Sequence, residues 1–150
     1  MDDTYIKVGG KDRFLYRAVD KEGNTVDFLL TKRRQKISAQ KFFNKVIENN
    51  GRPRIINIDK SGSNTEGIRT WNKRSISVNK IRIRRVKYLN NIVEQDHRNI
   101  NRRIVNCTGF KEFESAQRTL SGIEVVSRIR KNQIRHSKNT TFKTFVSLAA

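Results

Sequence analysis

The feature that most constrains the fold is a change of hydrophobic period after residue 31. Up to that point, apolar and polar residues alternate in three short runs, over residues 2–8, 13–20 and 25–31. Such alternation is typical of strands that bury one face. The glycines at 9–10 and the stretch KEGN at 21–24 supply turns between the runs. Strands joined by such short turns predict an antiparallel sheet of three consecutive strands.

The next segment has helical spacing instead. Ala39, Phe42 and Val46 recur at intervals of three and four residues, which places them on one face of a helix. Ser38 is the candidate N-cap of this helix, and Gly51 is the candidate stop signal.

The same patterns predict five further elements. They are a short strand over 54–60, a polar loop over 61–67 leading to a short helix around Trp71, a strand over 76–89, and helices over 92–105 and 112–131. Strands that arrive through helical crossovers extend a hairpin sheet on its edge. The order therefore predicts an α/β fold, in which a mixed five-stranded sheet is flanked by helices.

Charge indicates the class of partner. The chain has 33 Lys and Arg against 14 Asp and Glu, a net charge of +19. A field of this sign favours polyanions, nucleic acid first and an anionic membrane surface second. No apolar run approaches the length of a membrane span and no signal-peptide segment follows the start, so we expect neither a spanning nor a secreted protein. Nucleic acid is the expected partner, with no membrane partner. The single Cys107 excludes an internal disulfide and a zinc site of several cysteines, which fits a reducing cytoplasm.

Three acidic residues stand out on three different predicted elements. Asp2 opens the first strand, Asp59 ends the fourth, and Glu94 lies in the first turn of the penultimate helix. If the first and fourth strands are neighbours, the two aspartates meet at one edge of the sheet, and the helix can bring the glutamate over them. Each residue also has a simpler explanation: a terminal residue, a turn residue, or an acid favoured by the helix dipole.

Carboxylates gathered in this way repel one another unless cations neutralise them. Oxygen ligands with open positions suit Mg²⁺ or Mn²⁺, which retain waters and bind substrate phosphate. Two such ions about 4 Å apart can activate an attacking oxygen and stabilise a leaving one in phosphodiester chemistry.

Four motifs carry a family resemblance. The stretches MDDTYIKVGG…FLYRAVDKEGNTVDFLL, PRIINIDK, VKYLNNIVEQDHR and GFKEFESAQRTLSGIEVVSRIRK resemble the catalytic core of bacterial insertion-sequence transposases of the DDE class. The resemblance covers about residues 1–133 and leaves 134–150 as a flexible tail. It implies an RNase H-like fold, with Asp2, Asp59 and Glu94 as the catalytic acids and ligands of two Mg²⁺ or Mn²⁺ ions. It also implies hydrolytic cleavage of DNA at an element end, followed by attack of the freed 3′-hydroxyl on target DNA.

The implied partner is DNA, both element ends and target. We expect contacts from seven basic side chains: Lys60, Arg82, Arg84, His97, Arg98, Arg102 and Arg103. The resemblance further implies a homodimer or higher oligomer in the active state, and a bacterial cytoplasmic location at the nucleoid.

Two alternatives compete with an active transposase core. The first is a catalytically inactive, truncated DNA-binding remnant. Asn101 stands where the resembled family has a basic residue, and the family's N-terminal DNA-binding region would precede the first acid, one residue from the start of this sequence. The second is a structural RNA-binding protein, which explains the charge and leaves the three acids unexplained. Aromatic residues among basic ones, such as Trp71, could stack on bases or belong to the core.

Overall fold

The first three strands form one antiparallel sheet. The computed structural model describes residues 1–58, 62–74, 80–85, 91–105, 109–134, 140, 143–144 and 146–147. Strand β1 (Asp2–Val8) pairs with β2 (Lys11–Val19), and β2 pairs with β3 (Thr25–Thr31), both antiparallel. The predicted meander of three strands is therefore confirmed.

The other two strands form a separate parallel pair, β4 (Ile55–Asn57) with β5 (Arg82–Arg84). The predicted single sheet of five strands is thus not seen in the described residues, although the mixed α/β character is. A hydrogen bond links the two sheets, in which the Met1 amino group donates to the Asn57 carbonyl at 2.9 Å. Because β1 begins at Asp2, this contact is made just ahead of the strand.

Both strands are also shorter than the ranges predicted for them, 54–60 and 76–89. Residues 59–60 at the end of the first, and 75–79 and 86–90 on either side of the second, lie outside the described part of the chain.

The helices follow the predicted periods. They are α1 (Lys36–Asn50), α2 (Gly62–Arg74), α3 (Asn91–Val105) and α4 (Phe113–Arg130). The predicted stop of α1 is confirmed, since Gly51 has a φ of 79° and donates its N–H to the Ile47 carbonyl. The predicted N-cap is wrong, because α1 is capped at Gln35. Ser38 lies inside the first turn, and its hydroxyl donates to the Arg33 carbonyl at 2.8 Å.

Helix α2 replaces most of the polar loop predicted over 61–67. Its spacing of Asn64, Ile68 and Trp71 puts one polar and two apolar side chains on the same face. Asn64 and Ile68 are fully buried, and Trp71 packs edge-on against Phe43 with ring centroids 6.2 Å apart. Tertiary burial therefore outweighs the turn-forming composition of this stretch. It also assigns Trp71 to the core.

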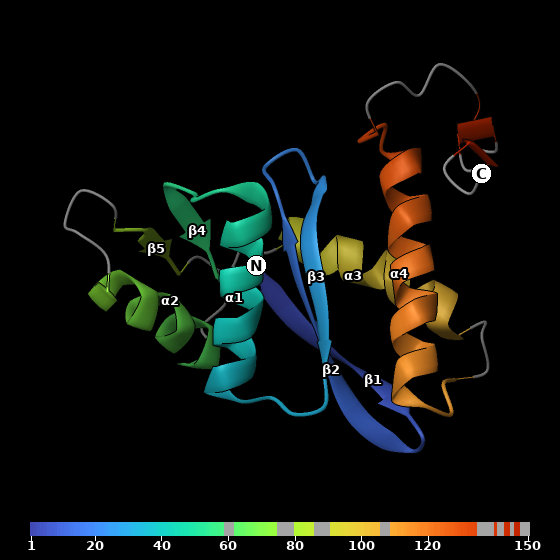
Figure 1. Cartoon of the computed structure of the whole chain (residues 1–150), viewed down its shortest axis with the longest axis horizontal. Coiled ribbons are helices and arrows are strands. Elements are labelled where there is room, and N and C mark those ends of the chain that lie inside the picture. The colour runs from blue at the N-terminus through green and yellow to red at the C-terminus, as the bar shows by residue number, and fades with distance from the viewer. Residues whose placement is uncertain are drawn as a thin grey trace.

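Helices lie on both sides of the three-stranded sheet (Figure 1): α1 packs on one face with α2 against its outer side, and α3 and α4 lie on the other face. Each face has its own apolar core. The core towards α1 and α2 includes Tyr16, Phe42, Phe43 and Ile68, whereas that towards α3 and α4 includes Leu15, Ile100 and Leu120. None of the described helices combines the length and apolar character needed to cross a membrane.

The predicted flexible tail remains a prediction. Much of 134–150 lies outside the described residues, and Thr144 within it is buried.

Candidate functional site

Two of the three predicted acids lie on described elements. Asp2 is the first residue of β1 and is half-buried, and its Oδ1 accepts a hydrogen bond from the Asp3 backbone N–H at 2.9 Å. Glu94 lies in the first turn of α3 and is exposed. Asp59 and Lys60 lie outside the described residues, directly after Ile58, which is fully buried at the end of β4.

A cavity of about 540 Å³ brings the neighbours of all three acids together. Met1 precedes Asp2, Asn57 lies two residues before Asp59, and Val93 precedes Glu94. All three of these neighbours line the cavity. The start of β1, the end of β4 and the start of α3 therefore border the same cavity, and the meeting of the three carboxylates there remains a prediction.

The position of His97 does not agree with the predicted contact to DNA. Its ring is buried, with 5% of the residue exposed, and neither ring nitrogen has a hydrogen-bond partner among the described residues. The pKa of His97 is lowered from 6.5 to about 4, first by burial and then by the charges of the Arg17 guanidinium and the Met1 amino group, against an opposing effect of Asp96. The neutral imidazole is thus enclosed beside the start of β1 and is not placed to contact phosphate.

The predicted arginines lie on two exposed surfaces. Arg98 and Arg102 follow Glu94 at successive four-residue steps on α3, so the three form one exposed stripe. Arg103 is half-buried on the same helix. On β5, both Arg82 and Arg84 are exposed.

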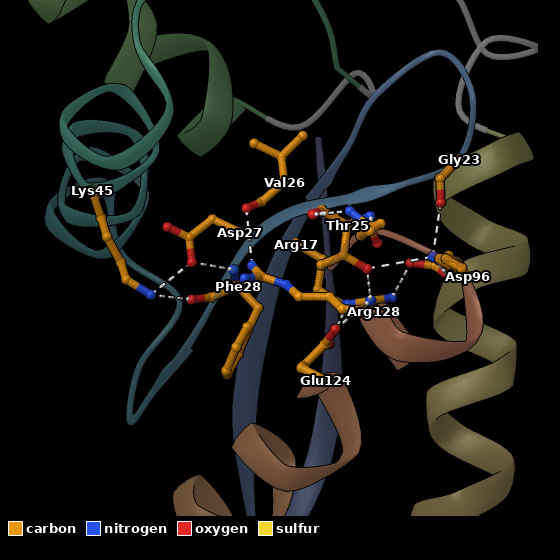
Figure 2. A network of polar contacts seen from close by, with 12 residues as sticks. Arg17, Gly23, Thr25, Val26, Asp27, Phe28, Lys45, Asp96, Glu124 and Arg128 are labelled. Carbon is orange, nitrogen blue, oxygen red and sulfur yellow. Dashed lines mark hydrogen bonds and ion pairs between the residues drawn. The ribbon is translucent and has the colours of Figure 1, made fainter. Parts of the chain in front are cut away.

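A buried ion network joins the sheet to α3 and α4 (Figure 2). Arg17 of β2, which is 0% exposed, contacts Asp96 Oδ2 of α3 through Nη1 at 2.7 Å. It also contacts Glu124 of α4 through Nε at 2.8 Å and Nη2 at 3.0 Å, a bidentate pair. One guanidinium thereby joins the sheet to both helices on this face.

Lys131, next to the end of α4, completes the network. Its Nζ lies 2.7 Å from Asp96 Oδ1 and donates to the Gly23 carbonyl at 2.7 Å. Two cations and two carboxylates therefore balance, which is the condition under which buried charges are tolerated.

A sequence signal for this network exists, separate from the pattern of the three acids. Arg17 follows Leu15 by two residues on the same face of β2, where both are buried, and Glu124 follows Leu120 by four residues on α4. Asp96 lies between Val93 and Ile100 at helical spacing. Charged residues at core-facing positions on three elements are costly singly, and this favours their pairing.

A second network lies on the opposite face of the sheet. The Asp3 carboxylate lies 2.9 Å from Arg34 Nε and accepts a hydrogen bond from the Asn64 side chain at 3.4 Å. Asn64 is in the first turn of α2, so Asp3 ties the helix that follows Asp59 to β1. Burial raises the pKa of the neighbouring Tyr16 to about 12, and the Asp3 charge contributes to the rise.

The donor chemistry at the site fits a hard divalent cation. The two described candidates are carboxylates, from a strand start and a helix start that border one cavity, and carboxylate oxygens are the protein ligands that Mg²⁺ and Mn²⁺ prefer. Within the described ranges, which omit Asp59, no cluster of three or more His, Cys, Asp or Glu side chains could hold a metal.

Comparison with known families decides the identity. The model of the DDE domain of IS240-type transposases matches residues 1–133. The chain belongs to this DDE domain family. Its motifs and strand–helix order agree with that assignment.

Similar relatives include insertion-sequence proteins of Staphylococcus aureus. The DDE domain is 36% identical over 138 residues to the transposase for insertion sequence-like element IS431mec, and equally to that for insertion sequence element IS257 in transposon Tn4003. The match covers 90% of this chain and 58% of each relative, so the chain spans little more than half of their length.

A solved structure supports the fold. The cryoEM structure of the simian T-cell lymphotropic virus intasome in complex with PP2A regulatory subunit B56 gamma contains a chain that matches with a TM-score of 0.59. The match covers 95% of this DDE domain and 51% of that chain, at 17% sequence identity. This likeness fits the RNase H-like fold that the motifs implied.

Proposed function

We propose that this DDE domain is the catalytic core of an insertion-sequence transposase, which cleaves DNA strands and transfers them during transposition. The observation that carries the proposal is the cavity shared by Met1, Asn57 and Val93, the neighbours of the three candidate acids. Membership of the family supplies the reaction class.

The proposed catalytic residues are Asp2, Asp59 and Glu94, with roles as ligands of Mg²⁺ or Mn²⁺. The family generally uses divalent metal ions, and two of them would supply Lewis acidity at the attacking and leaving oxygens of the phosphodiester. The chain's own contribution is to hold the carboxylates in place before the substrate arrives. Asp2 is fixed by its strand and by the Asp3 N–H, and Glu94 by the packing of α3 on the sheet.

The proposed DNA interface follows the exposed stripe on α3. Arg98 and Arg102 extend from Glu94 along the helix surface, while Arg82 and Arg84 present a second basic surface on β5. Contacts from such side chains to phosphates position a duplex without reading its sequence. Lys60 and Arg103 remain proposed contacts, whereas His97 is left out because of its burial.

The active form is proposed to be a homodimer or higher oligomer acting on element ends and target DNA. A DNA substrate would place it at the bacterial nucleoid. The relatives that match over 90% of the chain are named transposases, which favours an active core over an inactive remnant.

The test is nicking of supercoiled plasmid DNA with Mg²⁺, with Mn²⁺ and with EDTA. We expect metal-dependent nicking that Glu94→Gln abolishes, because the amide keeps the shape and removes the charge that holds the cation. Asp59→Asn should have the same effect.

The matched control is Glu114→Gln, which makes the same change on α4 at a side chain that is 81% exposed. It should leave nicking unchanged. Nicking by Glu94→Gln at the control rate would refute the proposed site.

A further inference from the structure

We propose that Arg17 is a positioning residue for Glu94, acting through its ion pair with Asp96. This inference rests on the proposed function and adds a residue to it. Arg17 is 0% exposed, so its guanidinium has no access to DNA or to a metal at the surface. Its effect on the site must pass through the side chains that it contacts.

The geometry of α3 links Asp96 to Glu94. Two residues along an α-helix correspond to a rotation of about 200°. Asp96 therefore points into the sheet while Glu94 points to solvent, and the observed burial of each agrees. Fixing Asp96 fixes the rotation and axial position of this turn, and with them the direction in which the Glu94 side chain leaves the helix.

Arg17 also links this helix to the first candidate acid. In the β1–β2 register, Arg17 is the direct partner of Asp2, and directly paired residues share one face of a sheet. The same side chain therefore stands across from Asp2 and holds the helix of Glu94 at 2.7 Å through Asp96. The relative placement of the two acids is set through one guanidinium.

Directional contacts are needed to orient α3 on the sheet, because much of the interface between the helix and the sheet is apolar. Ile100 and Ile104 of α3 pack into the core on this side of the sheet, and such burial is non-directional. A charge-assisted hydrogen bond constrains both distance and angle. Glu124 holds Arg17 at two atoms, and Lys131 holds the second oxygen of Asp96, so neither partner of the pair is left to rotate.

The experiment compares Asp96→Asn and Arg17→Lys with the unaltered 150-residue chain. Asp96→Asn keeps the shape and removes the charge, whereas Arg17→Lys keeps the charge and removes the fork-shaped contact. The control is Asp12→Asn, at an exposed aspartate that pairs with Lys7 at the same distance of 2.7 Å.

The first readout is Mn²⁺ binding to the protein without DNA, measured from the electron paramagnetic resonance signal of free Mn²⁺. The second is the nicking rate at saturating DNA, separated from KM. Outer contacts that orient metal ligands change metal affinity or activity about 10–100-fold when removed. We expect a loss of that size in Mn²⁺ affinity and in kcat for Asp96→Asn, a smaller loss for Arg17→Lys, and an unchanged KM for DNA.

A purely structural role predicts a different result. Asp96→Asn and Arg17→Lys would then melt at lower temperature but, when assayed well below the melting transition, would match the control in Mn²⁺ affinity and kcat. That result would overturn the inference. If Asp96→Asn fails to fold, Lys131→Gln replaces it. This change leaves the Arg17–Asp96 pair in place and removes the Lys131 Nζ contacts to the second Asp96 oxygen, the Gly23 carbonyl and the Thr25 hydroxyl. Unchanged Mn²⁺ affinity in Lys131→Gln and Arg17→Lys would then overturn the inference.

Glu94→Gln in the same assays separates the two proposals. If it abolishes Mn²⁺ binding and nicking while the Asp96 and Arg17 variants resemble the control, only the positioning role fails. If Glu94→Gln itself retains binding and nicking, the proposed function fails, and the positioning role with it.

Discussion

Acidification should destabilise this domain through His97 before most carboxylates are protonated. The pKa of His97 in the folded chain is about 4, against 6.5 for the ordinary side chain. A histidine with a lowered folded pKa contributes stability that is fully present above pH 6.5 and is lost as the pH falls towards 4. Between these values the unfolded chain binds a proton that the folded chain excludes.

The magnitude follows from the two pKa values. Between about pH 7.5 and about pH 5, the linkage relation gives a loss of about 2 kcal/mol in the free energy of unfolding. The full separation of the two values corresponds to about 3 kcal/mol at lower pH. For a domain of this size, a loss of about 2 kcal/mol lowers the melting temperature by roughly 4–8 °C.

The assay is urea unfolding followed by circular dichroism, at several pH values in that range. His97→Leu removes the titrating group and leaves no unpaired polar atom in its place, so this variant should lose much less stability on acidification. The difference between the two chains isolates His97 from every carboxylate that they share. If the unaltered chain and His97→Leu lose stability in parallel between about pH 7.5 and about pH 5, the enclosed neutral imidazole is not the cause and the reasoning fails.

Two other substitutions test the fold and the DNA surface. Gly9 and Gly10 both have positive φ angles, but a Cβ at Gly9 would lie 2.9 Å from the Lys111 carbonyl oxygen, whereas one at Gly10 meets nothing within 4 Å. Both glycine-to-alanine changes should therefore cost about 1–2 kcal/mol in backbone strain, with Gly9→Ala the more destabilising in urea unfolding. Equal losses would show that the contact with Lys111 is readily relieved. For DNA, neutralising ~6 phosphates gives a log–log salt slope near −5 on any duplex, and Arg102→Ala should make the slope shallower by about 1; an unchanged slope in salt titrations would remove Arg102 from the interface.

The elements are predictable from local pattern, and their pairing less so. Period-two alternation locates β1 and β3 to the residue, because each strand buries one face against a helix layer. Local composition favours a loop over 61–67, since its Ser, Gly and Asn residues are turn formers. Only the tertiary burial of Asn64 and Ile68 makes this stretch helical. The placement of β4 beside the first sheet also depends on a tertiary contact, the Met1–Asn57 hydrogen bond.

Candidate site residues can be proposed from the sequence where chemistry alone specifies a residue type. Asp2 and Glu94 stand out because metal sites need carboxylates, and the structure brings their neighbours to one cavity. The prediction for His97 is wrong because it followed the one-turn spacing from Glu94. His97 also lies four residues after Val93 and three before Ile100, at the helical spacing of the face that α3 buries. The partners of Arg17 lie 79 and 107 residues away in sequence (96 − 17 and 124 − 17), a separation that no local pattern resolves.

The two polar networks meet at the start of β1, and this gives the strand a role beyond its hydrogen bonds. Successive side chains of a strand point to opposite faces, so Asp2 faces α3 and α4 while Asp3 faces α1 and α2. Asp3 holds Asn64 in the first turn of α2, the helix that follows Asp59. Across from Asp2, Arg17 holds the helix that carries Glu94. Side chains at the start of β1, or directly across from it, therefore hold both helices: α2, which follows Asp59, and α3, which carries Glu94. Because the described strands β1 and β4 belong to separate sheets, these side-chain contacts supply alignment that a continuous sheet would otherwise provide.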